Sequence, residues 1–282
     1  MASHIVCAMF ETRALIPRSA FSLRDAPRAG DVWRSFQEIA VDASTDAGWP
    51  PKRYRDESAA FIVRSMTVRH AQEPYYGEAL TGTTWVSRMR RELFSTREVR
   101  IVSKERGAIA SARQEWVHVS AAMVPTRAPK SLLDAFEPET APGDFLEPTL
   151  PEITEKFAAS ATLEFEFDAW WTWMDPLDHA NHPAYIDWCD EALSRSLAAK
   201  GMNPLALLPA AEEVTFRFGV RGGQRVSVRS HALGFDSKGN LAVAHRIFAL
   251  LPEGETLAAN ATTFRRLHGE QERTQLAALF TP

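Results

Sequence analysis

The order of helical and strand-like patterns constrains the fold of this chain more than any other feature of its sequence. A proline-marked segment from Pro125 to Pro151 divides the chain, and on each side of it one long helical pattern is followed by several strand-like runs. A helix followed by antiparallel strands buries its apolar face against the resulting sheet, which makes an α+β unit. The repeated order predicts an internal duplication, with one such unit in each half.

The two helices are expected over 31–47 and 183–200, where apolar residues recur at helical spacing. Runs rich in Val, Ile, Thr and aromatic residues predict the strands. They cover 60–69, 78–88, 95–104 and 108–120 in the first half, and 163–169, 213–218, 225–233, 241–250 and 257–266 in the second. We therefore expect a domain at 1–130, a proline-rich linker at 131–157 and a second domain at 158–282.

Composition excludes several classes of protein. The 282 residues are 45% hydrophobic and 24% charged, which is typical of a globular chain and not of a disordered or fibrous one. A net charge of −4 gives no basis for a general affinity for nucleic acid. The longest stretch without charged residues, Gly201–Ala211, is too short for a membrane-spanning helix. Cys7 and Cys189 alone make neither a disulfide framework nor a zinc site, and the N-terminal residues do not resemble a signal peptide, so we expect a cytoplasmic protein.

The start of the second helix carries the clearest chemical signal in the chain. Pro183 occupies the position of a first helical residue, and it follows a short loop rich in polar side chains. These are Asp175, Asp178, His179, Asn181 and His182. Amides at a helix N-terminus are donors that favour negative charge, so a carbonyl aimed there is polarised as it becomes an oxyanion. The loop would hold acid and base groups beside that position.

The spacing Asp175-x-x-x-His179-x-Asn181-x-x-x-Tyr185 resembles the signature of thioesterases with the hotdog fold. In the first half, residues 112–119 followed by Thr126-Arg127 are similar to a strand and turn of the acyl-ACP thioesterases, which carry two hotdogs in one chain. The resemblance is thus to double-hotdog acyl-ACP or acyl-CoA thioesterases of the 4-hydroxybenzoyl-CoA thioesterase-like superfamily. It implies two tandem hotdog domains, each a long helix wrapped by a curved antiparallel sheet, and hydrolysis of an acyl thioester to a free acid and a thiol.

The resemblance also implies roles for individual residues. Asp175 takes the place of the catalytic carboxylate and acts as general base or as nucleophile. His179 and Asn181 complete the catalytic group, and the helix amides are the oxyanion donors. Substrate-binding roles fall to Tyr185, Trp173 and His182. The family uses no cofactor, and the spacing of the loop's His and Asp residues matches no standard zinc motif, so we expect neither a cofactor nor a metal ion.

The sequence departs from the family pattern at several positions. Asp178 replaces a glycine, His182 replaces an asparagine, and Leu177 stands where plant acyl-ACP thioesterases have a further catalytic asparagine. Those plant enzymes also carry a glutamate on the strand after the helix, whereas residues 218–223 here contain no carboxylate. The alternative to an active hydrolase is therefore a weak or inactive hotdog protein that binds acyl thioesters.

Each site residue also has a purely structural interpretation. Asp175 before Pro176 is a common turn residue, Asn181 is a favoured helix cap, and Tyr185 fits simple packing. Arginines at 88, 90, 91, 217, 221, 225 and 229 either meet the phosphates of CoA or an acidic carrier protein, or lie on solvated strand faces. The first half lacks a His-x-Asn motif, which predicts one catalytic site per chain. We expect a monomer or a homo-oligomer that binds acyl-CoA or an acyl carrier protein.

Overall fold

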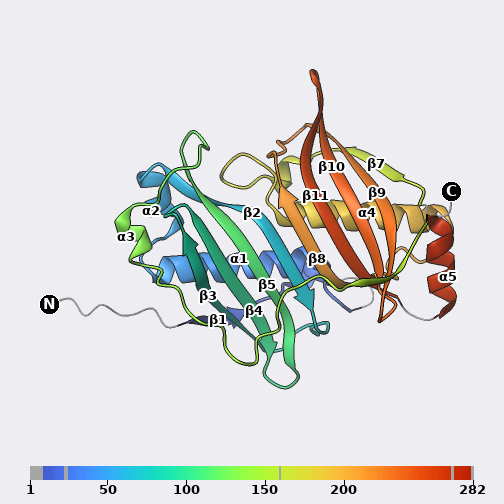
Figure 1. The fold of residues 1–282 in the computed structure, drawn as a ribbon, viewed down its shortest axis with the longest axis horizontal. Coiled ribbons are helices and arrows are strands. Elements are labelled where there is room, and N and C mark those ends of the chain that lie inside the picture. Colours follow the sequence, from blue (N-terminus) through green and yellow to red (C-terminus); the bar gives the residue numbers. More distant parts are fainter. Residues whose placement is uncertain (1–8, 22–24, 159, 268–269, 281–282) are drawn as a thin grey trace. The chain divides into compact units, whose positions relative to one another are not determined.

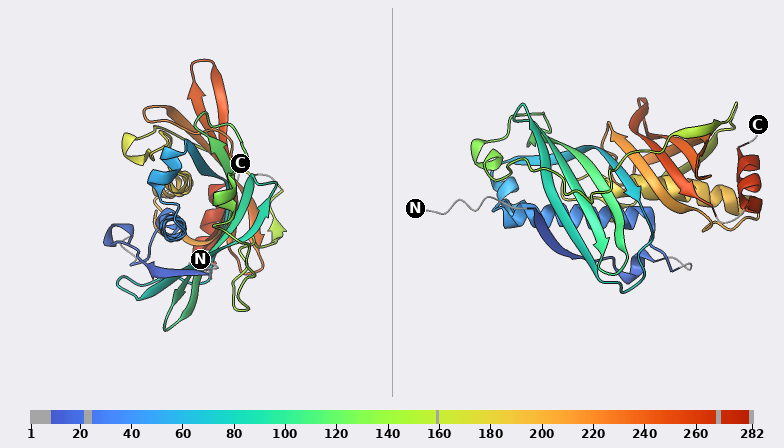
Figure 2. Two further views of the ribbon diagram at one scale, coloured as in Figure 1. Left: turned by 90° about the vertical axis from the view of Figure 1, so that its left-hand side faces the viewer. Right: turned by 60° about the horizontal axis from the view of Figure 1, so that its bottom comes forward.

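Two compact units make up the chain, and the computed structural model describes residues 9–21, 25–158, 160–267 and 270–280. Unit 1 is the described part of Met1–Pro17 with Trp33–Pro148, and unit 2 is the described part of Arg18–Val32 and of Thr149–Pro282. In each unit one long helix lies against one face of an antiparallel sheet (Figures 1 and 2). This arrangement confirms the α+β class predicted from the sequence.

Unit 1 is built on helix α1 (Ala29–Asp46), whose first turn belongs to the segment assigned to unit 2. Its strands run in the spatial order β1 (Phe10–Ala14), β3 (Leu80–Arg90), β4 (Phe94–Ser103), β5 (Gly107–Ser120) and β2 (Ala59–His70), each antiparallel to its neighbours. The short helices η1 (Arg18–Ala20), α2 (Pro51–Asp56) and α3 (Lys130–Leu133) lie in the connections.

The apolar stripe of α1 packs directly on this sheet. Trp33, Phe36 and Ile39 are at most 2% exposed. At Gly82 of β3, a Cβ atom would stand 2.4 Å from the Cδ1 atom of Ile39, so any larger residue would force the Ile39 side chain to move. The helix and the sheet therefore share one core, as the helical spacing of apolar residues predicts.

The proline-rich segment that follows β5 lies along the sheet of unit 1 instead of extending from it. The Glu139 N–H donates to the Val86 carbonyl at 2.8 Å, and the ring of Phe145 meets Trp85 edge-on with 5.0 Å between centroids. Two ion pairs hold the segment further along, Arg100 with Asp144 at 2.7 Å and Arg113 with Glu147 at 2.6 Å. The part of the predicted linker up to Pro148 is thus assigned to unit 1, and the rest of it to unit 2.

Unit 2 repeats the pattern around helix α4 (Pro183–Ala199). The strands β8 (Leu208–Phe216), β11 (Gly254–Arg266), β10 (Leu241–Leu251) and β9 (Arg225–Asp236) follow one another across the sheet. Two short strands, β6 (Ile153–Lys156) and β7 (Leu163–Asp168), pair with opposite ends of β9. The one-turn helix η2 (Trp171–Trp173) precedes α4, and α5 (Glu270–Leu279) ends the described chain.

Helix α4 has the boundaries that its sequence predicts. Pro183 supplies the first helical residue, where a missing N–H costs no hydrogen bond. Apolar residues spaced three and four apart, including Ile186, Cys189 and Leu193, are at most 1% exposed. At the other end, Gly201 has φ of 72°, a left-handed conformation that closes the helix. This places the start of α4, and the polar loop before it, at one fixed position beside its sheet.

Candidate active site

The loop between η2 and α4 holds most of the predicted site residues. It folds back on itself, with Met174 and Ala180 forming an isolated antiparallel bridge. The Asp175 N–H donates to the His179 carbonyl at 2.9 Å and closes the loop. Asp178 lies at the turn with φ of 61°, a left-handed conformation that Asp adopts more readily than most residues. The loop therefore has one defined backbone conformation from which its side chains project.

The side chains of Asp175 and His179 face each other across this loop. The Asp175 Oδ2 atom lies 3.5 Å from the His179 Nδ1 atom, a separation that becomes an ion pair when the imidazole is protonated. The other carboxylate oxygen, Oδ1, accepts the Leu177 N–H at 2.8 Å and so fixes the rotamer of Asp175. The two side chains are 15% and 24% exposed. A carboxylate and an imidazole are thus held together within reach of solvent.

Asn181 follows directly and does not serve as a helix cap. Its backbone N–H donates to the Trp173 carbonyl at 2.9 Å. Its side-chain oxygen Oδ1 is buried and has no hydrogen-bond partner among the described residues, and the cap position itself belongs to His182, which makes no side-chain capping bond. A buried polar atom without a partner costs free energy. No hydrogen bond of this oxygen within the described residues explains why an asparagine stands here.

The first backbone amides of α4 already donate to backbone carbonyls, which differs from the prediction that they would be oxyanion donors. Pro183 has no N–H, the Ala184 N–H donates to the Asn181 carbonyl at 2.9 Å, and the Tyr185 N–H donates to the His182 carbonyl at 3.3 Å. The first turn is tight enough to supply acceptors for its own amides. The Asn181 side-chain amide, directly before the cap residue His182, remains a candidate donor at this turn.

Tyr185 lies beneath the loop, 2% exposed, and ties it to a second loop. Its hydroxyl donates to the Phe218 carbonyl at 3.2 Å and accepts the Val220 N–H at 3.2 Å. Burial raises the pKa of Tyr185 to about 12, and the nearby charge of Asp175 adds to the rise. The Ala180 N–H in turn donates to the Val220 carbonyl at 2.7 Å. The phenol therefore stays neutral and holds the segment after β8 against the candidate site.

This second loop, residues 217–224, contacts His179 through a glycine. A Cβ atom at Gly219 would stand 3.1 Å from both the Cβ and the Cδ2 atom of His179, which is tighter than an ordinary contact. The sequence analysis noted that this loop has no carboxylate, but it did not anticipate that the loop borders the imidazole. The one sequence signal for the contact is the cluster of glycines at 219, 222 and 223.

Trp173 and His182 lie among aromatic rings. The Trp173 ring is 5.7 Å from that of Trp188 on α4, 5.8 Å from Phe167 and stacked at 4.9 Å on Trp170. The His182 ring meets Phe216 of β8 with 6.1 Å between centroids. Both predicted substrate-binding residues are thus half-buried beside the loop, with rings that pack against the core of unit 2.

A cysteine and two arginines that the sequence analysis considered as functional residues have structural roles instead. Cys189 is fully buried on α4, and burial raises the pKa of its thiol, so it lacks the exposure and the thiolate character of a nucleophile. Arg225 pairs with Glu166 and Asp168, and Arg229 pairs with Glu164 and Glu255. These two arginines have their charges balanced on the sheet itself.

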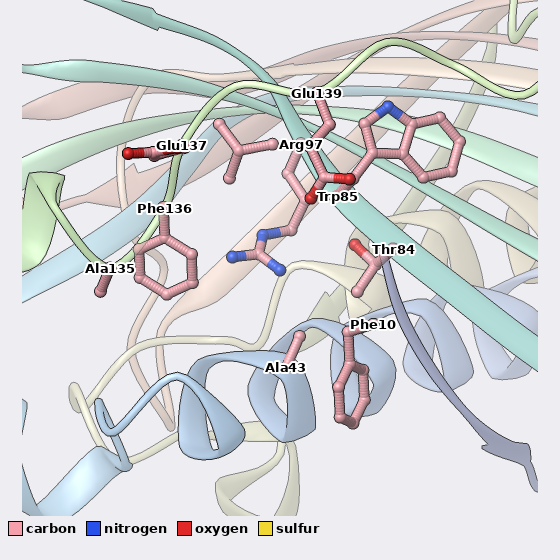
Figure 3. Close-up of a pocket in the computed structure, with 10 residues that line it drawn as sticks. Phe10, Ala43, Thr84, Trp85, Arg97, Ala135, Phe136, Glu137 and Glu139 are labelled. Atoms are coloured by element: carbon pink, nitrogen blue, oxygen red, sulfur yellow. The ribbon is translucent and has the colours of Figure 1, made fainter. Parts of the chain in front are cut away.

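A small hollow opens in unit 1, where the start of β1 meets the segment after α3 (Figure 3). The Arg97 side chain points into it, and the guanidinium lies 5.1 Å from the ring centroid of Phe136. Glu137 and Glu139 line the same hollow, and burial raises the pKa of Glu139. Its mixed charge identifies no ligand.

Within the described ranges, no group of three or more His, Cys, Asp or Glu side chains is placed to hold a metal ion. In the same part of the chain, no helix combines the length and the apolar character needed to cross a membrane.

Comparison with known proteins shows that part of the chain is similar to a known superfamily. Residues 169–273 match the thioesterase-like superfamily. The matched range contains the loop of Asp175 and His179, helix α4 and strands β8 to β11, so the thioesterase-like match coincides with the candidate site. No curated protein matches the chain by sequence.

Solved structures with the same fold cover nearly all of the chain. A protein of Lactobacillus plantarum assigned as an oleoyl thioesterase is 16% identical, with a TM-score of 0.77 over 95% of this chain and 99% of its own. The 12:0-ACP thioesterase of Umbellularia californica is 14% identical, with a TM-score of 0.70 over 92% of this chain and 94% of its own. An acyl-ACP thioesterase of Bacteroides thetaiotaomicron is 14% identical, with a TM-score of 0.68 over 92% of this chain and 98% of its own. With the superfamily match, they confirm the predicted resemblance to hotdog thioesterases.

Proposed function

We propose that this chain is a thioester hydrolase that cleaves an acyl thioester at the loop before α4. The observation that carries the proposal is the pairing of the Asp175 carboxylate with the His179 imidazole at 3.5 Å, inside the range that matches the thioesterase-like superfamily. Each unit, a helix on an antiparallel sheet, is on this proposal one hotdog domain, and two such domains in tandem form the chain. The same likeness supports an acyl-CoA or acyl carrier protein thioester as substrate, and a cytoplasmic location stays a prediction from the sequence.

The loop supplies groups for each part of hydrolysis. As general base, Asp175 takes a proton from water while the water oxygen attacks the thioester carbonyl carbon. The carbonyl oxygen becomes an oxyanion, to which the Asn181 side-chain amide donates. The intermediate then collapses, the carbon–sulfur bond breaks, and the thiolate takes the proton, leaving a free acid and a thiol. His179 orients the water or delivers the proton to the sulfur.

A direct attack by Asp175 uses the same atoms in a different order. The carboxylate oxygen bonds to the acyl carbon, the thiolate leaves, and water then hydrolyses the resulting anhydride. Both routes need the ionised Asp175 side chain, and both give the same acid and thiol.

The test is release of free thiol from a panel of acyl-CoAs and acyl carrier proteins. Asp175→Asn keeps the shape of the side chain and its bond to the Leu177 N–H, and we expect hydrolysis to fall by about two to four orders of magnitude. The matched control is Asp178→Asn, an exposed carboxylate on the same loop whose left-handed φ suits Asn; it should retain activity.

If the wild type hydrolyses nothing in the panel, the proposal fails, and the absence of a carboxylate in residues 218–223 favours the alternative function, an acyl-thioester-binding protein without hydrolysis. If the wild type is active and Asp175→Asn is unimpaired, the catalytic role of Asp175 is overturned.

A further inference from the structure

Large apolar side chains lie exposed beside the candidate active site. Trp170 is 63% exposed, Trp171 is 72% exposed and Leu177 is 40% exposed. Exposed apolar side chains gathered at one place mark a binding surface, and tryptophan is among the residues that contribute most to binding. In the chain, Trp170 and Trp171 precede Asp175, and Leu177 follows it by two residues. We call these three residues, together with Arg221, the tryptophan surface.

The indole rings of this surface are held in place by the fold. Trp171 lies on the tight turn from Arg221 to Gln224, where a Cβ atom at Gly222 would stand 2.5 Å from the Trp171 Cε3 atom. The ring of Trp170 stacks on Trp173 with an angle of 8° between the planes. Rings that are fixed before a ligand arrives lose little conformational entropy on binding.

The tryptophan surface lies within reach of a thioester at the catalytic loop. Loop 217–224 touches His179 at Gly219 and Trp171 at Gly222. Three residues of fully extended chain span at most about 10 Å. A group attached to a thioester beside Asp175 therefore extends onto the tryptophan surface without a large change in the protein.

The charged side chains around this surface bear on whether the acyl group is carried by CoA or by an acyl carrier protein. The Arg221 side chain is exposed and has no ion pair within the described part of the chain. The arginines of β9 are paired with carboxylates, whereas Arg217, in the same loop as Arg221, is exposed as well. The loop thus offers two exposed cations, which match the phosphates of a small molecule, whereas docking an acidic carrier protein calls for a broad basic face.

We propose that the tryptophan surface binds the phosphopantetheine arm of CoA. The indoles of Trp170 and Trp171 pack on the arm, and the Arg221 guanidinium pairs with a phosphate. This inference rests on the proposed thioester hydrolase and narrows its substrate to acyl-CoA. The phosphopantetheine of an acyl carrier protein shares the arm, and the experiment below separates the two sources.

The test is calorimetric titration with desulfo-CoA, which carries no thioester and reports binding without hydrolysis. Trp171→Ala and Arg221→Gln should each weaken binding by about tenfold or more. Tyr76→Ala and Arg55→Gln alter exposed residues of unit 1 and should leave the affinity unchanged. Pantetheine, which lacks the phosphate, should respond to Trp171→Ala and not to Arg221→Gln.

Equal affinity of wild type, Trp171→Ala and Arg221→Gln for desulfo-CoA would overturn the inference. So would hydrolysis of acyl carrier protein thioesters by a wild type that binds no desulfo-CoA. If the variants lose desulfo-CoA binding while the wild type hydrolyses no thioester, the tryptophan surface stands and the proposed hydrolase fails.

Discussion

At the scale of single residues, His179 has room for its side chain because residue 219 is a glycine and carries no Cβ atom. The imidazole fills the space beside this glycine, and its Nδ1 atom faces Asp175 at 3.5 Å. Tyr185 holds the glycine loop from below through the carbonyl of Phe218 and the amide of Val220. The spacing of the acid–base pair is therefore determined by the second loop as well as by the first.

Gly219→Ala tests this dependence. The new methyl group would meet three side-chain atoms of His179, Cβ, Cγ and Cδ2, at 3.1 to 3.2 Å and force a shift of the imidazole that faces Asp175. Because misplacing a catalytic group by a fraction of an ångström to one ångström is costly, we expect kcat to fall by about tenfold to a hundredfold. KM should change little. Steady-state thiol release measures both.

The control for this substitution is Gly143→Ala, since a Cβ atom there meets nothing within 4 Å. Equal kcat for Gly219→Ala and wild type would show that the position of His179 does not matter for turnover.

The sequence predicted the residues of the loop, and it did not predict what surrounds them. Asp175, His179 and Asn181 lie within seven positions, so local spacing was enough to group them. The partners of the Tyr185 hydroxyl are 33 and 35 residues away in the chain. Contacts at such separation depend on how the strand packs on the helix, which no local pattern records.

At the scale of elements, the longest patterns were the most predictable. Both long helices and the strands β2 to β5, β7 and β9 to β11 lie within three residues of their predicted limits. Strand β8 begins at Leu208, five residues before the prediction, because Pro209 interrupts its strand-like pattern while still pairing with Arg265. The prediction missed β1, β6, α2, α3 and α5. Most of these are too short to show periodicity, so tertiary contacts determine them.

One buried histidine joins three strands of unit 2 and gives a prediction about pH. His245 on β10 is 1% exposed; its Nδ1 atom lies 2.8 Å from the Ser230 hydroxyl and its Nε2 atom 2.9 Å from the Thr263 hydroxyl. Burial lowers the pKa of His245 from 6.5 to about 3, and the positive charge of Arg265 contributes. The folded chain therefore keeps this imidazole neutral where the unfolded chain protonates it.

Stability should accordingly be highest above pH 6.5 and fall as the pH drops from 6.5 towards 3, since only the unfolded state gains the proton. The slope from one such group is at most about 1.4 kcal/mol per pH unit. His245→Gln keeps a donor and an acceptor but does not titrate, so it should flatten this slope. Urea unfolding of both proteins from pH 7 to pH 5 measures it, and parallel slopes would contradict the assignment.

At the scale of the whole molecule, two similar units carry unequal chemistry. Both place a helix on an antiparallel sheet, which the repeated order of patterns indicated from the sequence. The start of α1 carries Asp31, which pairs with Arg28 at 2.7 Å, whereas the loop before α4 carries an acid, an imidazole and an amide. A chain of two such units needs both sheets for its cores, but the proposed hydrolysis needs only one set of acid–base groups.

This asymmetry predicts a single catalytic site per chain. Asp175→Asn should remove nearly all thiol release, because no second set of groups remains to act. Asp31→Asn, which alters the carboxylate at the other helix start, should leave kcat within about twofold of wild type because this carboxylate is engaged in an ion pair with Arg28 and its segment lacks a His-x-Asn motif. If both units reacted, Asp175→Asn would instead keep about half of the activity. Comparing initial rates of the three proteins at saturating substrate decides between one site and two.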